Sequence, residues 1–334
     1  MTLLRQVARG TGARDTGRRA ATVRAAVALG LVMLAALIPL LGPSGALHGT
    51  GEAAAPGVRW TGLLRTVLFA AVCVPVGEAF VNRLAARLPG APVPPPRSWS
   101  GYAAAAGWLA SAGLAAVVAT GNLLPHGLGQ IDVGGLYRTR DGVLALLEVN
   151  GFLAAGLCVF ARRPSAQVWP LSVVILAEAL RAHPVTEDSP LVGSVLTLVH
   201  LTCAALWAGG LLHVLRTLRV RRGREGAALL GRFSRAAALL LAAITATGMC
   251  STLRRMPADT VLDQLTTTAY GRALLAKVIL VAGVGALAAW ARLRLRRAAD
   301  PLSALVPART EVALLGLVIA ASGLLTALPL PIRW

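Results

Sequence analysis

The chain has 334 residues, of which 56% are hydrophobic and only 14% are charged. A soluble domain cannot bury that much apolar surface, so the composition predicts a protein that crosses a membrane several times. The net charge of +19 comes from arginines grouped between apolar runs, which is typical of topology signals and not of a nucleic-acid-binding face.

The N-terminal region is basic. Residues 1–24 carry six arginines and predict a cytoplasmic arm, followed by a first apolar span over about 25–41. The pair Arg18 and Arg19 in front of this span could instead belong to an export signal that ends near Ala46. We favour a retained helix because the internal repeat described below requires it.

Eight further apolar runs follow, which makes about nine membrane spans in an all-α bundle. Each run is near the length of about 20 residues that a helix needs to cross the hydrocarbon, although the fifth is short. The eight runs are Leu63–Val81, Tyr102–Leu124, Val143–Ala161, Val168–Leu180, Leu191–Leu215, Ala236–Ser251, Ala273–Ala291 and Val312–Leu328.

The arginines are distributed unequally between the two sides of this arrangement. Connections on the side of the N-terminal arm carry 23 arginines, whereas those on the other side carry eight. Because cytoplasmic loops are enriched in Lys and Arg, the N-terminus is expected in the cytoplasm and the C-terminus outside it.

A repeated pattern supports the span count. The sequence VVATGN at 117–122 resembles ITATGM at 244–249, and TRDGVLALLEV at 139–149 resembles TAYGRALLAKV at 268–278. An offset of 127 to 129 residues corresponds to four spans, so the chain is expected to form a parallel four-plus-four repeat with a ninth helix appended. The expected divisions are the basic arm (1–24), a first four-helix half (25–165) and a second half with the ninth helix (166–334).

The repeat places two ionisable residues at equivalent positions. Glu148 is the penultimate residue of the first copy of the motif, and Lys277, the only lysine of the chain, is the penultimate residue of the second. The two charges could pair across the pseudo-twofold axis, or each could face water at the edge of the membrane.

The sixth span carries the strongest candidate for a functional site. His200 lies inside an apolar run, and Cys203 and Trp207 follow it on the same helical face. An ionisable side chain at membrane depth is a functional-site hypothesis by default. Trp207 precedes Gly209 and Gly210, which are residues that let helices approach closely.

Three segments together resemble a known family. They are VHLTCAALWAGGLL at 199–212, GRFSRAAALLLAAITATG at 231–248 and TTTAYGRALLAKVIL at 266–280. They are similar to the copper resistance D (CopD) family of bacterial inner-membrane proteins, most clearly over 190–330. The resemblance implies an integral protein of the bacterial cell membrane that handles copper beside an extracytoplasmic copper-binding partner. The residues that match the family pattern are His183, His200, Trp207, Tyr270, Gly271, Arg272 and Lys277.

A copper site can be proposed from these residues and their soft neighbours. Cu(I) prefers thiolate and thioether ligands and accepts imidazole. In the expected topology the candidate ligands approach one another near the outer surface, and Glu178 is expected to orient a ligand histidine from behind. The candidate ligands are His200, His183, Met249, Cys250 and Cys203, with Glu178, Trp207, Lys277 and Glu148 in supporting roles. Only three methionines follow the initiator, so a methionine-rich path is absent.

Three functions remain open from the sequence. The first is a non-enzymatic copper-handling protein that receives copper, as Cu(I) rather than Cu(II), from the extracytoplasmic face. The second is a haem-binding redox protein in which His200 and Lys277 would be the pair of interest. The third is an assembly subunit without a metal site. The chain has no GxxxxGK[ST] motif, which argues against an ATP-driven pump.

Overall fold

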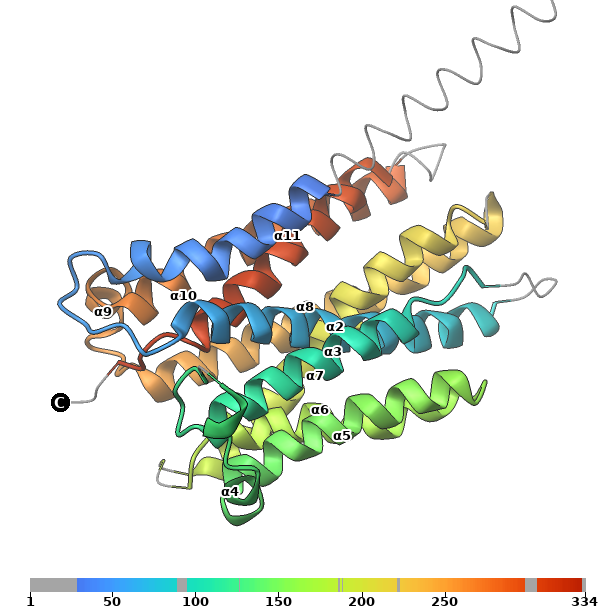
Figure 1. Cartoon of the computed structure of the whole chain (residues 1–334). Coiled ribbons are helices and arrows are strands. Elements are labelled where there is room, and N and C mark those ends of the chain that lie inside the picture. Colours follow the sequence, from blue (N-terminus) through green and yellow to red (C-terminus); the bar gives the residue numbers. More distant parts are fainter. Residues whose placement is uncertain are drawn as a thin grey trace, which may run out of the picture.

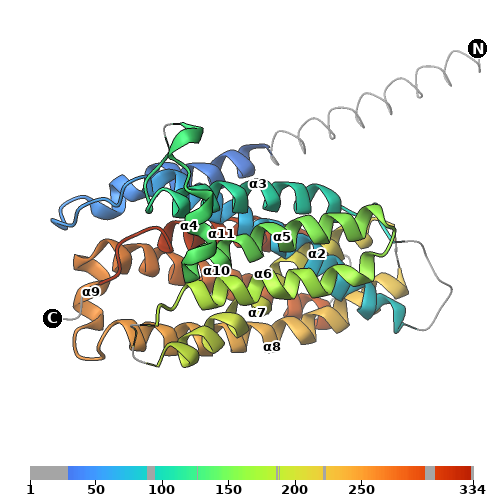
Figure 2. The ribbon, with the colours of Figure 1, turned by 60° about the horizontal axis from the view of Figure 1, so that its bottom comes forward.

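The computed structural model describes residues 29–88, 95–125, 127–185, 187, 189–220, 223–297 and 305–331. The expected basic arm and the Arg18–Arg19 pair lie outside these ranges. Within them the chain is all helical, and the long helices run side by side in an elongated bundle (Figures 1 and 2). The all-α bundle expected from the sequence is confirmed.

In the described part of the chain, seven helices are long and apolar enough to cross a membrane. Two more of the expected spans correspond to α6 and α11 (Leu305–Leu325). Helix α6 (Val168–Arg181) has 14 residues, or about 21 Å at 1.5 Å each, which is less than the thickness of the hydrocarbon. The count of nine therefore stays a prediction. The seven are the N-terminal helix Leu29–Leu47, α2 (Val58–Ala86), α3 (Ser100–Ala119), α5 (Arg140–Phe160), α7 (Pro190–Thr217), α8 (Arg224–Arg255) and α10 (Ala269–Arg297).

Helices α5 and α10 each begin at a threonine whose side chain caps the helix. Thr139 caps α5 by accepting a hydrogen bond from Gly142 N at 3.1 Å, and Thr268 makes the same bond with Gly271 N at 3.0 Å at the start of α10. A short helix precedes each cap, α4 (Val133–Arg138) before α5 and α9 (Val261–Thr267) before α10. The two motifs aligned by the repeat thus share one local structure.

Helix α2 forms the centre of the bundle. It packs against α3 on one side and against α7 and α11 on the others, with further contacts to α6 and α8. Its apolar side chains contribute to all three buried clusters. One is shared mainly with α7 and α8, another mainly with α3, α5 and α6, and the third, through Val58, mainly with α10 and the end of α11. Helix α2 therefore bounds part of the space around α7.

The crossing of α2 and α7 depends on glycines. A Cβ atom on Gly209 would collide with the carbonyl group of Cys73, and one on Gly77 would collide with the backbone of Gly209. Small residues at such a crossing let two backbones approach closely. This contact fixes the rotation of α7, and with it the directions in which His200 and Trp207 point.

We predict that Gly209→Ala destabilises the protein by about 1–3 kcal/mol, since an added methyl group in a close-packed contact forces the backbones apart. Thermal unfolding of the purified protein in detergent measures this change. Gly231→Ala is the matched control, because nothing lies within 4 Å of the Cβ position of Gly231 in α8. Equal unfolding temperatures for the two variants would show that the crossing is not tightly packed.

Candidate functional site

A cavity of about 220 Å³ lies among α2, α6, α7, α8, α10 and α11. We call it the His200 cavity. Most of its lining is apolar, and its polar side chains come from α7, α8, α10, α11 and the end of α6. Those side chains are Glu178, Thr197, His200, Ser251, Thr252, Arg255, Tyr270, Lys277, Ser322 and Thr326. The sequence prediction that His200 and Lys277 belong to one site agrees with this arrangement.

The hydrogen bonds of His200 decide which of its nitrogens is available. Nδ1 lies 3.0 Å from Oγ1 of Thr247 in α8, and that hydroxyl lies 2.7 Å from the Ala243 carbonyl oxygen. Because the hydroxyl donates its single proton to the carbonyl, it accepts a proton from Nδ1. This tautomer leaves a lone pair on Nε2, the form in which imidazole binds a metal ion.

Two cationic side chains share the cavity with His200. Nη1 of Arg255 donates a hydrogen bond to the Tyr270 hydroxyl at 2.9 Å, and its guanidinium group lies 5.8 Å from the centre of that ring. Lys277 comes from α10, and in the described part of the chain no carboxylate lies within ion-pair distance of its amino group. A cation held by His200 would therefore share the cavity with positive charge.

The expected pairing of Glu148 with Lys277 is wrong. Glu148 lies 3.1 Å from Nη2 of Arg181, and the same guanidinium nitrogen lies 3.1 Å from Glu178. Glu178 also accepts a hydrogen bond from Arg65 at 2.5 Å. Buried carboxylates need such partners, and the arginines at the end of α6 and in α2 are nearer than Lys277.

The sequence suggested that Glu178 orients a ligand histidine. In the structure Glu178 does not do so. Its two oxygens are bound by Arg65 and Arg181. His183 is held instead by Glu187, whose oxygen lies 2.6 Å from Nδ1, and by Thr197, whose hydroxyl lies 2.9 Å from Nε2. Both ring nitrogens of His183 are thus already engaged.

His183 fixes the connection between α6 and α7. Its ring is buried and packs against Gly193, where any larger residue would collide with it. Burial lowers the pKa of His183 below its ordinary value of 6.5, and the hydrogen bond with Glu187 opposes this effect only in part. The neutral ring is therefore the stable form in the folded protein.

We predict that this connection loses stability on acidification. A histidine with a lowered pKa in the folded state stabilises the fold above the unfolded value of 6.5 and loses that contribution as the pH falls through the folded value. The melting temperature should therefore fall more between pH 7.5 and 5.5 in the wild type than in His183→Gln. Parallel pH profiles would contradict the prediction.

The three predicted sulfur ligands do not line the His200 cavity. Met249 is 64% exposed and Cys250 is also exposed, because Thr247, Gly248 and Ser251 occupy the inward face of α8. Cys203 packs against the apolar cluster shared by α7 and α8. Across the described ranges, no group of three or more His, Cys, Asp or Glu side chains is close enough to hold a metal ion.

Trp207 has a role that the sequence did not reveal. Its indole Nε1 donates a hydrogen bond to Glu311 in α11 at 3.2 Å, and both side chains are almost completely buried. Glu311 was missed because it stands just before the expected start of the ninth span. An acidic residue at the edge of an apolar run was the available signal.

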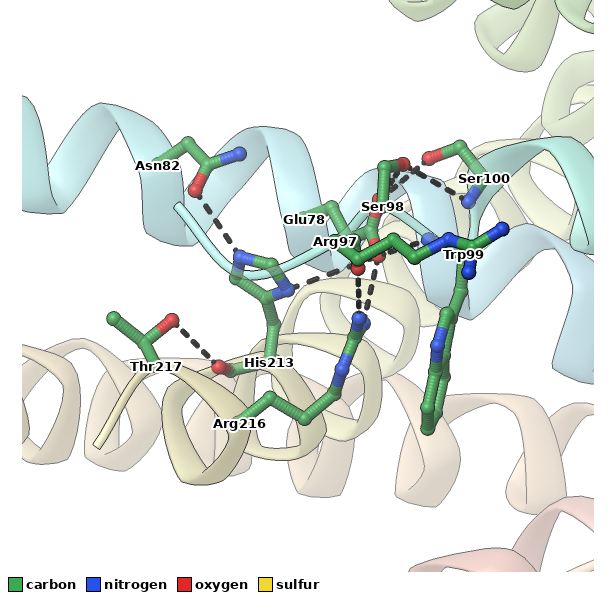
Figure 3. Close-up of polar contacts among 9 residues, drawn as sticks. All are labelled: Glu78, Asn82, Arg97, Ser98, Trp99, Ser100, His213, Arg216 and Thr217. Carbon is green, nitrogen blue, oxygen red and sulfur yellow. Dashed lines mark hydrogen bonds and ion pairs between the residues drawn. The ribbon is translucent and has the colours of Figure 1, made fainter. Parts of the chain in front are cut away.

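A second polar cluster lies at the opposite end of α7 (Figure 3). The Glu78 carboxylate of α2 accepts hydrogen bonds from Ser98 Oγ at 2.5 Å, Trp99 N at 2.8 Å, Ser100 Oγ at 2.7 Å and Arg216 Nη1 at 2.8 Å. The Arg216 guanidinium group also lies 3.7 Å from the centre of the Trp99 ring. These bonds tie the segment before α3 to α2 and α7.

His213 completes this cluster from α7. Its Nε2 lies 3.1 Å from Oδ1 of Asn82, and its Nδ1 lies 3.8 Å from the Glu78 carboxylate (Figure 3). Sequence analysis assigned no role to Glu78, although this residue interrupts an apolar run, and it counted Arg216 only among the arginines that follow the sixth span. The dense hydrogen bonding of Glu78 indicates a structural anchor.

Comparison with known families and proteins gives one match. Residues 227–327 match the family model CopD, described as Copper resistance protein D. This segment contains almost all of α8 and the whole of α9, α10 and α11, and therefore Thr247, Lys277 and Glu311. No curated protein and no solved structure matches the chain. The resemblance noted in the sequence is confirmed over the matched residues.

Proposed function

Because residues 227–327 match the copper resistance protein D family, we propose that the protein carries copper ions through the membrane as a transporter and not as an enzyme. His200 is the observation on which the proposal rests. Its Nε2 has a free lone pair, and its ring lines a cavity that three helices of the matched segment help to form. Imidazole is an accepted ligand of cuprous ion.

The chemistry of the His200 cavity favours the passage of copper ions over their storage. Among the described residues that line it, His200 is the only one with an imidazole and Cys73 of α2 is the only one with a sulfur atom, whereas Met249, Cys250 and Cys203 do not line it. Conduction requires a site that binds strongly enough to admit an ion and weakly enough to release it. A site with one imidazole beside Lys277 and Arg255 meets that requirement better than a closed three-ligand site.

The distribution of arginines supports the direction from which copper arrives. The connections at the end of the bundle opposite His183 carry the arginine excess, so that end is assigned to the cytoplasm. His183 and the end of the His200 cavity that Arg255 and Tyr270 line then face the extracytoplasmic side of a bacterial inner membrane. An extracytoplasmic copper-binding protein would deliver Cu(I) there.

Haem does not fit the His200 cavity. The cavity holds about 220 Å³, which is below the range of about 300–1,000 Å³ that is usual for sites of drug-sized ligands. A second axial histidine is also missing from the lining: His183 uses both nitrogens in other bonds, and His213 lies at the opposite end of α7. The structure therefore favours copper over the redox alternative.

The proposal is tested on the purified protein in detergent. Metal analysis after exposure to Cu(I) and removal of the excess should give about one bound copper per chain, and the visible spectrum should lack a Soret band. A protein that retains no copper and moves none into liposomes would overturn the proposal. A Soret band with a full complement of iron would establish the haem alternative instead.

A further inference from the structure

A second cavity of about 200 Å³ lies deeper in the same helices. We call it the Glu311 cavity. It is lined by α7 through Trp207 and Leu211, by the first half of α8, by the second half of α10 and by Glu311 of α11. Within the described chain, no Arg or Lys lies within ion-pair distance of Glu311, although Arg292 lines the same cavity. A buried carboxyl group without a cationic partner marks this cavity as a site for positive charge.

The two cavities follow each other along every helix that they share. On α8 the His200 cavity is lined by residues between 244 and 255, and the Glu311 cavity is lined by residues between 230 and 241. On α10 the corresponding residues are 270–284 and 285–292, and on α11 Glu311 comes before residues 315–326. The cavities are therefore stacked end to end. Along α10 they extend from Tyr270 to Arg292, or about 33 Å, which matches the thickness of the hydrocarbon core.

Among the described residues, only Trp207 lines both cavities. Its ring is 3% exposed, and the glycines that follow it in α7 press the helix against α2, so the backbone at this point cannot withdraw. The hydrogen bond from Nε1 to Glu311 fixes the orientation of the ring. The indole therefore forms the partition between the two cavities.

We propose that the two cavities are the halves of one cation path across the membrane, closed at Trp207 by an indole that Glu311 holds in place. The inference rests on the proposed function for the identity of the cation, which is copper, but the path and its gate are geometric claims that can be tested alone. A cation leaves His200, passes the displaced indole and meets the carboxyl group of Glu311. No covalent or redox step is involved.

The path is tested by thiol labelling from each side of the membrane. In a background where the four cysteines are replaced by alanine, Ser251→Cys reports on the His200 cavity and Ser234→Cys on the Glu311 cavity. Both serines lie on α8, about 25 Å apart. A charged, membrane-impermeant thiosulfonate should label residue 251 in spheroplasts and residue 234 in inside-out vesicles, and neither from the other side.

Removing the partition should connect the cavities. With Trp207→Ala, residue 234 should also be labelled in spheroplasts, at a rate at least about tenfold above that found with Trp207. Trp207→Phe and Glu311→Leu should each raise the rate about tenfold, the factor expected from losing a hydrogen bond to a charged group. The double variant Trp207→Phe, Glu311→Leu should raise the labelling rate little beyond either single variant, because both changes break the same hydrogen bond. Glu311→Gln keeps an acceptor and should stay near the parent rate.

The outcomes separate this inference from the proposed function. Labelling of residue 234 from both sides in the parent, or from neither side after Trp207→Ala, would overturn the path. Labelling with the two sides exchanged would retain the path and reverse the assigned orientation. If the labelling pattern is as expected but Cu(I) does not enter liposomes, the path stands and copper is the wrong cargo.

Discussion

Replacing His200 with alanine is expected to abolish copper movement while leaving the bundle folded. His200 supplies the single imidazole among the described residues of its cavity, and its Nε2 carries the lone pair that would bind the ion. Loss of groups that merely orient a metal ligand already reduces metal affinity about 10- to 100-fold, so loss of the ligand should reduce the rate by at least that factor. The measurement is uptake of Cu(I) by liposomes that contain the purified protein.

Further substitutions of His200, with controls at two exposed residues of α8, distinguish a metal-ligand role of His200 from a packing role. His200→Met restores a soft donor and should recover part of the uptake, whereas His200→Gln, with only a hard amide oxygen and an amide nitrogen, should not. Met249→Ala and Cys250→Ser are the controls, because both side chains are exposed on α8 and should leave uptake unchanged. Full uptake by His200→Ala, or equal loss with Met and Gln, would refute a ligand role.

Glu78→Leu is expected to have the largest effect on stability. It removes the acceptor of four hydrogen bonds and leaves the Arg216 guanidinium group buried without its carboxylate. Breaking one partner of a buried ion pair costs about 3–5 kcal/mol, because the remaining charge stays out of water. The free energy of unfolding in detergent measures this loss.

The double variant Glu78→Leu, Arg216→Leu should be more stable than Glu78→Leu alone, since it removes the unpaired charge as well. Arg83→Ala is the control on the same helix. Its side chain is exposed, and the change should stay within about 0.5 kcal/mol of the wild type. If Glu78→Leu unfolds like the control, the cluster is not an anchor of α2, α7 and the segment before α3.

Properties that depend on neighbours along the chain could be predicted well. The apolar runs predict the long helices, and the spacing of seven residues places His200 and Trp207 on one helical face, which lines the cavity. The family resemblance also came from contiguous segments. Each of these features is fixed by the helical period and by side chains within a few residues.

Partners contributed by other helices could not be predicted. Equivalent positions in the repeat suggested that Glu148 could pair with Lys277, but its partner in the structure is Arg181. The chain has 32 arginines with long side chains, and the sequence does not show which of them reaches Glu148. Met249 and Cys250 were expected near His200 because the predicted topology places all three residues toward the outer surface of the membrane. The rotation of α8 instead turns Thr247 and Gly248 inward and those two residues outward.

The sequence by itself therefore determined a membrane-crossing helical bundle, the side that carries the arginines and the face of α7 that holds His200. The tertiary structure alone decided that this face lines a cavity, that Trp207 also lines a second cavity and that its indole donates a hydrogen bond to Glu311. The reason is physical: the helical period fixes which residues share a face, whereas the direction of that face depends on close packing, here on Gly77 and Gly209 at the crossing of α2 and α7.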